Sequence, residues 1–567
     1  MRAIRLVGMV ALCAVVAGCA SKAPEQLAKA PPPPPVIAPP PPPPPPPAPN
    51  VAANEAIVVT ATRRAPQSLQ SASPITTVSG PSVADARKMR SFVPPVVIAT
   101  DPGNEKYDGK DVSAVKLTQA EPVSTFAVDV DTGAYANARR FLTQGQMPPQ
   151  AAVRTEEMIN YFRYDYAKPK DRSQPFTVTT DVAKTPWNEG TYLMRIGLRG
   201  YDIDSAERPP ANLVFLLDVS GSMAAQDKLP LVKTALAGLA SELSPKDKVS
   251  IVVYAGAAGL VLEPTNDTAK IKRALEALDA GGSTAGGAGI ELAYRIAEDN
   301  FIKGGVNRVI LATDGDFNVG VSDTKALIEL IEKKRDTGIT LTTLGFGQGN
   351  YNEALMEQVA NHGNGNYAYI DTALEAKKVL GDEMQSTLFT IAKDVKIQVE
   401  FNPAVIAQYR LVGYENRALR EQDFDNDLVD AGDIGAGHQV TAIYEVVPIG
   451  AKGWIAPRKY EDKPDSAATQ QLAEAANVKL RYKLPDGDRS KLIEQVVASS
   501  AFRDAAAPRG DFAFAAAVAA FGQVLRGDDL MQGYSFDDIT TLAGSQDNYW
   551  RQEFVQLNEL ASSMKGG

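Results

Sequence analysis

The sequence contains very little cysteine or histidine. The only cysteines are Cys13 and Cys19, both near the N-terminus, so we expect no internal disulfide and no thiolate metal site in the folded body. The only histidines, His362 and His438, lie in different predicted domains, and neither neighbours a serine elbow. A hydrolytic nucleophile activated by a histidine base is therefore disfavoured.

The chain also lacks any block of lysines, and its formal net charge is −10 with acidic and basic residues interspersed. This charge pattern argues against nucleic-acid binding. Near the N-terminus, Arg2 and Arg5 precede an apolar run from Leu6 to Ala17, which is too short to span a membrane stably. This order predicts a secretory signal, so we expect export.

Small residues and a cysteine end this run, from Val16 to Cys19. They resemble the lipobox of bacterial lipoproteins, which implies a signal peptide over residues 1–18 and lipidation of Cys19. By the same resemblance, Ala20 after the cysteine implies transfer to the outer membrane, facing the periplasm or the cell surface. Several acyl chains anchor a protein stably where one would not. An ordinary signal with a chance cysteine is the alternative.

Residues 19–100 form a predicted disordered linker rich in proline, with tracts from Pro31 to Pro35 and from Pro39 to Pro47. In polyproline II geometry, some 35 residues could hold the body roughly 100 Å from the lipid. Within the linker, Glu55 to Arg64 looks like the segment near the plug of TonB-dependent receptors and is suited to strand pairing. A linker with a chance β-branched run is the simpler interpretation.

Strands and helices alternate between residues 207 and 380. Amphipathic helical patterns separate apolar runs that are bounded by Gly, Asp or Pro. The predicted strands are Asn212 to Leu217, Lys248 to Tyr254, Arg308 to Ala312 and Ile339 to Leu344, and the predicted helices are Leu229 to Leu243, Ala269 to Leu278, Gly289 to Phe301, Thr324 to Arg335 and Asn352 to Asn361. Such a pattern predicts an α/β fold: a doubly wound, mostly parallel sheet with helices on both faces.

Two further folded regions flank this domain. Residues 101–206 form a predicted N-terminal module with helical spacing around Tyr135 and Phe141. Residues 381–567 form a predicted C-terminal module, in which a helical pattern runs to about Ile391 and is followed by strands and then by helices. We expect these strands to share a sheet with Phe176 to Leu198. We therefore predict a β-rich α+β support domain into which the α/β domain is inserted.

Oxygen-bearing side chains gather where the first strand of the α/β domain ends. Asp218, Ser220 and Ser222 follow that strand as D-x-S-x-S, at the sheet edge where α/β folds bind ligands. With Thr284 in a glycine-rich stretch and Asp314 after another strand, they resemble the metal-ion-dependent adhesion site (MIDAS) of von Willebrand factor type A (VWA) domains. Motifs around Asn104 to Tyr107, Glu121 to Phe126, Asp129 to Thr132 and Glu156 to Phe162 resemble the N-terminal module of one family of bacterial VWA lipoproteins.

The resemblance implies a Mg²⁺ site, with Mn²⁺ or Ca²⁺ as substitutes. Mg²⁺ prefers about six oxygen ligands and needs only one or two carboxylates. By resemblance, Ser220, Ser222 and Thr284 bind the ion directly, whereas Asp218 and Asp314 act mostly through water. Two carboxylates about 5 Å apart would repel by about 3 kcal/mol at an effective dielectric near 20, and a cation removes that conflict. Helix capping could explain the serines, but it requires neither Thr284 nor Asp314.

These observations favour a membrane-anchored, metal-dependent adhesion or scaffold protein over an enzyme. The incompletely neutralised ion would accept an acidic side chain from a protein partner. A periplasmic metal-dependent hydrolase is the second hypothesis, although the motif supplies no general base. The third is an accessory factor of an outer-membrane TonB-dependent receptor. The glycines from Gly345 to Gly349 lack the dinucleotide-binding spacing and predict a strand-to-helix turn.

Overall fold

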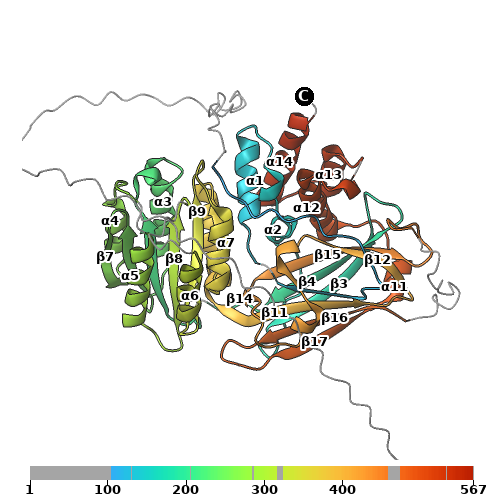
Figure 1. The fold of residues 1–567 in the computed structure, drawn as a ribbon, viewed down its shortest axis with the longest axis horizontal. Coiled ribbons are helices and arrows are strands. Elements are labelled where there is room, and N and C mark those ends of the chain that lie inside the picture. Colours follow the sequence, from blue (N-terminus) through green and yellow to red (C-terminus); the bar gives the residue numbers. More distant parts are fainter. Residues whose placement is uncertain are drawn as a thin grey trace, which may run out of the picture. The chain divides into compact units, whose positions relative to one another are not determined.

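The structure is a computed structural model, and it describes residues 104–128, 130–204, 206–283, 286–315, 324–456, 473–531 and 533–565 (Figure 1). The predictions for residues 1–103, including the signal peptide, Cys19, the linker and Glu55 to Arg64, lie outside the described residues. Thr284 also lies outside them. No helix in the described ranges has the length and apolar character needed to cross a bilayer.

Residues 211–370 contain a six-stranded sheet, as far as the chain is described, in the order β10-β9-β8-β5-β6-β7. Its strands are parallel except for β7, which pairs antiparallel with β6. The bounds are β5 Ala211–Asp218, β6 Lys248–Tyr254, β7 Ala258–Thr265, β8 Val306–Thr313, β9 Ile339–Phe346 and β10 Tyr367–Ile370. The chain leaves β5 toward β6 on one side and later returns to β8 on the other, so the sheet order reverses at β5.

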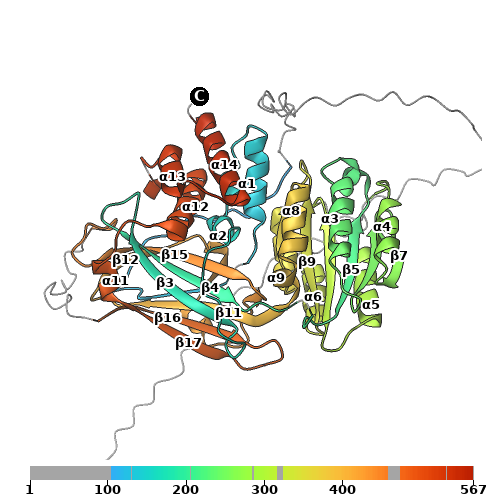
Figure 2. The ribbon, with the colours of Figure 1, turned by 180° about the vertical axis from the view of Figure 1, so that it is seen from behind.

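Helices cover both faces of this sheet (Figures 1 and 2). Leu213, Phe215 and Leu217 of β5 share a buried cluster with α3, α4 and α8, whereas Val214 and Leu216 share another with α5, α6 and α7. This alternation follows from the two-residue period of a strand. The helices are α3 Leu229–Ser241, α4 Thr268–Glu276, α5 Gly286–Asp299, α6 Thr324–Arg335, α7 Glu353–His362 and α8 Ala373–Lys377. The predicted doubly wound α/β fold is confirmed.

The support contains two sheets packed face to face. One has the order β1-β12-β15-β4-β3, and the other has the order β13-β2-β11-β16-β17 with β14 paired to β11. The first sheet consists of β1 Lys116–Leu117, β3 Phe176–Lys184, β4 Tyr192–Gly200, β12 Ile406–Val412 and β15 Gln439–Pro448. The second consists of β2 Val123–Ala127, β11 Thr390–Phe401, β13 Ala418–Leu419, β14 Gly432–Gly435, β16 Glu474–Lys483 and β17 Lys491–Ala498. Side chains of both sheets share one apolar core.

The segments before and after the α/β domain build these two sheets together. Strand β4 pairs antiparallel with β15, so that Ile196 lies opposite Ala442, and β2 pairs with β11, so that Phe126 lies opposite Ile397. The pairing predicted between Phe176 to Leu198 and the C-terminal strands is therefore present. However, β11 and β16 lie in the other sheet, because the strands divide between the two layers of a sandwich.

A helical layer covers the outer face of the first support sheet. Leu193 and Ile443 of that sheet share a buried cluster with Phe514 and Phe554 of the helices. The helices of this layer are α1 Gly133–Thr143, α2 Thr155–Asn160, α12 Gly510–Arg526, α13 Phe536–Ala543 and α14 Tyr549–Lys565, whereas α11 Ser499–Arg503 packs on the sandwich core through Phe502. The short 3₁₀ turns are η2 Gln150–Ala152, η3 Gly221–Ala224, η5 Glu415–Arg417, η6 Glu421–Asp423 and η7 Asp529–Met531.

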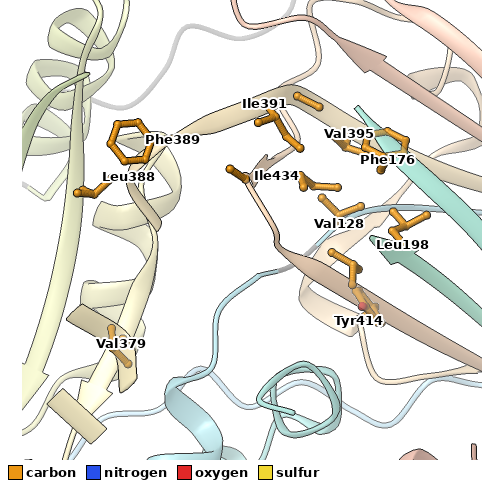
Figure 3. Packing of buried hydrophobic residues seen from close by; sticks show 14 of the residues in the cluster. Val128, Phe176, Leu198, Val379, Leu388, Phe389, Ile391, Val395, Tyr414 and Ile434 are labelled. Atoms are coloured by element: carbon orange, nitrogen blue, oxygen red, sulfur yellow. The ribbon is translucent and has the colours of Figure 1, made fainter. Parts of the chain in front are cut away.

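The α/β domain leads directly into the support through a broken helix. After α8 come a π-helical turn, η4 Lys378–Asp382, and α9 Met384–Leu388. Figure 3 shows Phe389, which directly precedes β11, beside Leu388 at the end of α9, and Ile391 in β11 on the side of the sandwich. The helix predicted to reach Ile391 is therefore wrong at its end, because Ile391 already belongs to a strand that pairs with β14 and β16.

Buried ion pairs fasten the α/β domain to the helical layer. Arg139 of α1 contacts Asp371 and Glu375 at 2.6 and 2.7 Å. Arg154, just before α2, contacts Glu353 and Glu357 of α7 at 2.9 and 2.6 Å. These side chains are at most 8% exposed, and charges this deeply buried are tolerated when they are paired.

Candidate metal centre

The centre lies at the carboxyl end of β5. Because β5 is flanked by β8 and β6, its end is the point at which the order of the parallel strands reverses, and α/β sheets form ligand crevices at such points. Asp218 is the last residue of β5 and is fully buried, Ser220 is 2% exposed, and Ser222 in the turn η3 is exposed. The arrangement therefore runs from a buried carboxylate to a hydroxyl at the surface.

Neutral donors hold the Asp218 carboxylate. Its Oδ1 accepts a hydrogen bond from the Ser220 amide at 2.9 Å, and its Oδ2 accepts from the Thr313 hydroxyl at 3.0 Å and the Tyr254 hydroxyl at 3.2 Å. These donors come from the loop after β5 and from both neighbouring strands. Burial raises the pKa of Asp218, and the negative charge of Asp314 raises it further. The site therefore favours a cation close to Asp218.

The hydroxyls of Ser220 and Ser222 lie close to each other in the loop after β5. Ser220 Oγ and Ser222 Oγ lie 3.0 Å apart, close enough to serve as neighbouring ligands of one ion. The glycine-rich loop that precedes Thr284 lies against them, because the Gly281 amide donates to Val219 O at 2.8 Å and the Gly221 amide donates to Gly282 O at 3.1 Å. The two serines therefore lie next to the loop that leads to Thr284.

Asp314 follows β8 and is also fully buried. Its Oδ2 accepts hydrogen bonds from Lys228 Nζ at 2.9 Å and from Asn350 Nδ2 at 3.2 Å. Lys228 Nζ also donates to Asn350 Oδ1 at 3.0 Å, which closes a triangle of three side chains. One of the two carboxylates thus has a built-in cation, whereas Asp218 is held by neutral groups.

The donor chemistry fits a hard divalent cation. Carboxylate and hydroxyl oxygens are the ligands that Mg²⁺, Mn²⁺ and Ca²⁺ prefer, and two carboxylates suffice for Mg²⁺. Across the described ranges, no group of three or more His, Cys, Asp or Glu side chains could hold a metal ion, so the centre differs from sites built on those residues alone. The serines supply the remaining oxygens.

Lys228 and Asn350 were missed in the sequence analysis. Lys228 directly precedes α3, and Asn350 lies in the loop between β9 and α7, just after the glycines predicted to form a turn. Both residues lie in loops that follow the carboxyl ends of strands, and this position in the sequence indicates that they could lie near the site. His362 lies at the end of α7 and contacts Glu332 at 2.8 Å.

Three family models match successive parts of the chain. The family model for the von Willebrand factor type A domain matches residues 212–382, the von Willebrand factor model matches 101–195, and the model described as "Uncharacterized protein YfbK, C-terminal" matches 386–564. The YfbK protein of Escherichia coli (strain K12) is 45% identical over 476 residues, which cover 82% of each chain.

Solved structures also align with the chain. The von Willebrand factor type A protein of Catenulispora acidiphila is 16% identical, with 70% of this chain and 91% of that chain covered and a TM-score of 0.38. Proximal thread matrix protein 1 of the mussel byssus, solved with a zinc-occupied MIDAS motif, is 22% identical, with 33% of this chain and 46% of that chain covered and a TM-score of 0.27.

Fold, motif and family model together define a protein built around a VWA domain, a type that typically mediates protein interactions. The predicted resemblance to VWA domains is thereby confirmed. The chain belongs to the YfbK family, with the N-terminal and C-terminal regions of that family on either side of the VWA domain.

Proposed function

We propose that this chain is a metal-dependent protein-binding protein whose centre at Asp218, Ser220, Ser222, Thr284 and Asp314 holds Mg²⁺, or Mn²⁺ or Ca²⁺, and receives an acidic side chain of a partner. The observation that carries the proposal is the pair of hydroxyls of Ser220 and Ser222, 3.0 Å apart, beside the buried Asp218. A helix cap alone would not require a second buried carboxylate, Asp314, at the same sheet edge.

Each described residue has a distinct part in this function. Ser222 is exposed, so it lies on the side from which a partner would approach. Asp218 is oriented by Thr313 and Tyr254, which keeps the buried face of the centre rigid. A bound divalent cation would supply an electrophilic position for the partner's carboxylate. The neutral serine ligands leave much of the ion's charge available for that contact.

The anchoring of the chain belongs to the same proposal. Lipidation of Cys19 would place the protein at the outer membrane, and residues 19–100 would serve as the spacer between lipid and body. The lipobox resemblance of Val16 to Cys19 supports this part. Metabolic labelling with a palmitate analogue tests it, because Cys19→Ser should abolish the label whereas Cys13→Ser should not affect lipidation of the mature chain.

Affinity capture from membranes, in Mg²⁺ or in chelator, tests the binding function. Wild type should retain a partner only in Mg²⁺, and Ser222→Ala should lose most of it without loss of folding, because Ser222 is exposed. Ser241→Ala, which removes an exposed hydroxyl from α3, is the matched control. Neutralising acidic residues of the captured protein should then abolish binding. Capture that is equal in Mg²⁺ and in chelator would overturn the proposal.

A further inference from the structure

The loop between β9 and α7 contacts the metal centre on one side and residues 104–107 on the other. On one side, Asn350 donates to Asp314 and accepts from Lys228. Gly347 packs directly on the Lys228 side chain, because a Cβ on this glycine would collide with the lysine methylenes. Gly315, just after Asp314, likewise leaves no room for a Cβ beside the Asn352 backbone. Movement of this loop would therefore disturb the surroundings of Asp314.

On its other side, the same loop is held by Asn104–Tyr107, which we name the N-terminal latch. The Glu105 carboxylate accepts a hydrogen bond from the Gly349 amide at 2.8 Å. The latch backbone adds two more bonds, from the Lys106 amide to Tyr351 O at 2.8 Å and from the Glu353 amide to Lys106 O at 3.0 Å. Lys106 also forms a parallel bridge with Asn352.

Helix α1 fixes the latch in place. Arg140 binds Glu105 in a bidentate pair at 2.8 and 3.1 Å, and the Glu105 side chain is 1% exposed. The Tyr107 hydroxyl donates to the same carboxylate at 2.5 Å. Gln144, which directly follows α1, donates a further hydrogen bond to Gln348 at 2.9 Å. A charge this well buried and paired has a defined position, so Glu105 is a firm attachment point for the loop.

From these contacts we propose that the N-terminal latch regulates the metal centre: through Gly349 and Asn350 it positions Asp314, so that closure of the latch and binding of the ion favour each other. This inference rests on the proposed function. Glu105, Asn350 and Lys228 are positioning residues, because they act on the ion through Asp314. Groups that orient metal ligands typically change metal affinity about 10-fold to 100-fold when they are removed.

The coupling must act in both directions, because two binding events that share a free energy affect each other equally. Removing the latch contact should weaken Mg²⁺ binding, and adding Mg²⁺ should protect the latch and the loop. A force that pulls on residues 1–103 would act first on the latch, because residues 104–107 directly follow them in sequence. Detachment of the latch would then lower the affinity for the ion, and with it the affinity for the partner.

Titration calorimetry with MgCl₂ and hydrogen exchange of the peptides over residues 104–107 and 347–353 test this proposal on the full mature chain. We expect Asn350→Ala to weaken Mg²⁺ binding about 10-fold and Glu105→Gln to weaken it about threefold, as an order-of-magnitude expectation for a group one step further from the ion. Mg²⁺ should slow exchange of both peptides in wild type. Glu121→Gln, which breaks an exposed ion pair with Lys116 in the same region, should change neither quantity.

The outcomes separate the two proposals. A merely structural role of Glu105 would lower the melting temperature in chelator and leave the Mg²⁺ dissociation constant unchanged. If wild type binds Mg²⁺ but Glu105→Gln binds it equally well and exchange does not respond to the ion, the latch proposal is wrong and the proposed function stands. If wild type takes up no divalent ion, the proposed function fails and the latch proposal fails with it.

Discussion

Buried carboxylates are treated differently in two regions of the molecule. Between the VWA domain and the helical layer, Glu353 and Glu357 share the guanidinium of Arg154, so their counter-charge is part of the chain. At the end of β5, Asp218 is equally buried, but the described groups that donate hydrogen bonds to it, from Ser220, Thr313 and Tyr254, are all neutral. In the first region the carboxylate charges are balanced by an arginine of the chain, whereas the second region is suited to a cation supplied from solution.

The largest effect should come from removing a built-in cation. Arg154→Met would leave Glu157, Glu353 and Glu357 buried around an apolar side chain, so we expect a loss of about 3 to 5 kcal/mol in the free energy of unfolding. Thermal denaturation would measure it. Arg172→Met, which breaks an exposed pair with Glu207, should cost less than about 1 kcal/mol. If both variants lost the same free energy of unfolding, the buried pairs of Arg154 would be no more important for stability than an exposed pair.

The next effect concerns the ion at Asp218. Mg²⁺ at 100 times its dissociation constant should stabilise wild type by about 3 kcal/mol, because the ion binds the folded state alone. Asp218→Asn keeps the size of the side chain and removes its charge, so it should unfold at a temperature that does not depend on Mg²⁺. In chelator, the variant should be at least as stable as wild type. Stabilisation by Mg²⁺ that is equal in both proteins would contradict this interpretation.

A smaller effect should appear at Asp433 of β14, where burial, together with the charge of Asp394, raises the pKa to about 7. Because the folded chain binds this proton more tightly than the unfolded chain, the stabilisation is present at low pH and is lost as pH rises from near 4 through about 7. Asp433→Asn should therefore be more stable than wild type at pH 8 and equal to it near pH 4. A pH titration of thermal unfolding would test the sign.

The smallest effect should come from Ser222→Ala. The exposed hydroxyl contributes little to folding, so the melting temperature in chelator should stay within the change of about 0.5 kcal/mol that is usual for surface substitutions. Its loss should instead reduce the stabilisation gained from Mg²⁺ by about 1 kcal/mol, which corresponds to about fivefold weaker binding. If Mg²⁺ stabilises the variant as much as wild type, the serine is no ligand.

The VWA domain was the region most accessible from the sequence. Its parallel strands are buried on both faces and therefore appear as continuous apolar runs, as in Leu213 to Leu217, with amphipathic helices between them. Strand β7 was missed because it is an antiparallel edge strand with little burial, and β10 was missed because it has only four residues.

The support was harder to predict, since several of its strand pairs, such as β4 with β15 and β2 with β11, join segments more than 200 residues apart. The pairing of β4 with β15 could be inferred, but the division into two sheets depends on which strands share a core, and no local pattern encodes that. At the candidate site, the D-x-S-x-S spacing identified Asp218, Ser220 and Ser222. The positions of Lys228 and Asn350 at the same sheet edge indicated that they lie near the site, but their contacts with Asp314 depend on the folded loops.

The most direct test of the account is anomalous diffraction from a crystal of the mature chain soaked in MnCl₂. We predict one strong peak at the end of β5, within about 2.0 to 2.6 Å of the hydroxyls of Ser220 and Ser222, the range of Mg²⁺ and Ca²⁺ distances to oxygen. Crystals of Asp218→Asn should lack that peak. Mn²⁺ bound elsewhere, with no density between the two serines in wild-type crystals, would contradict the assignment of a metal centre.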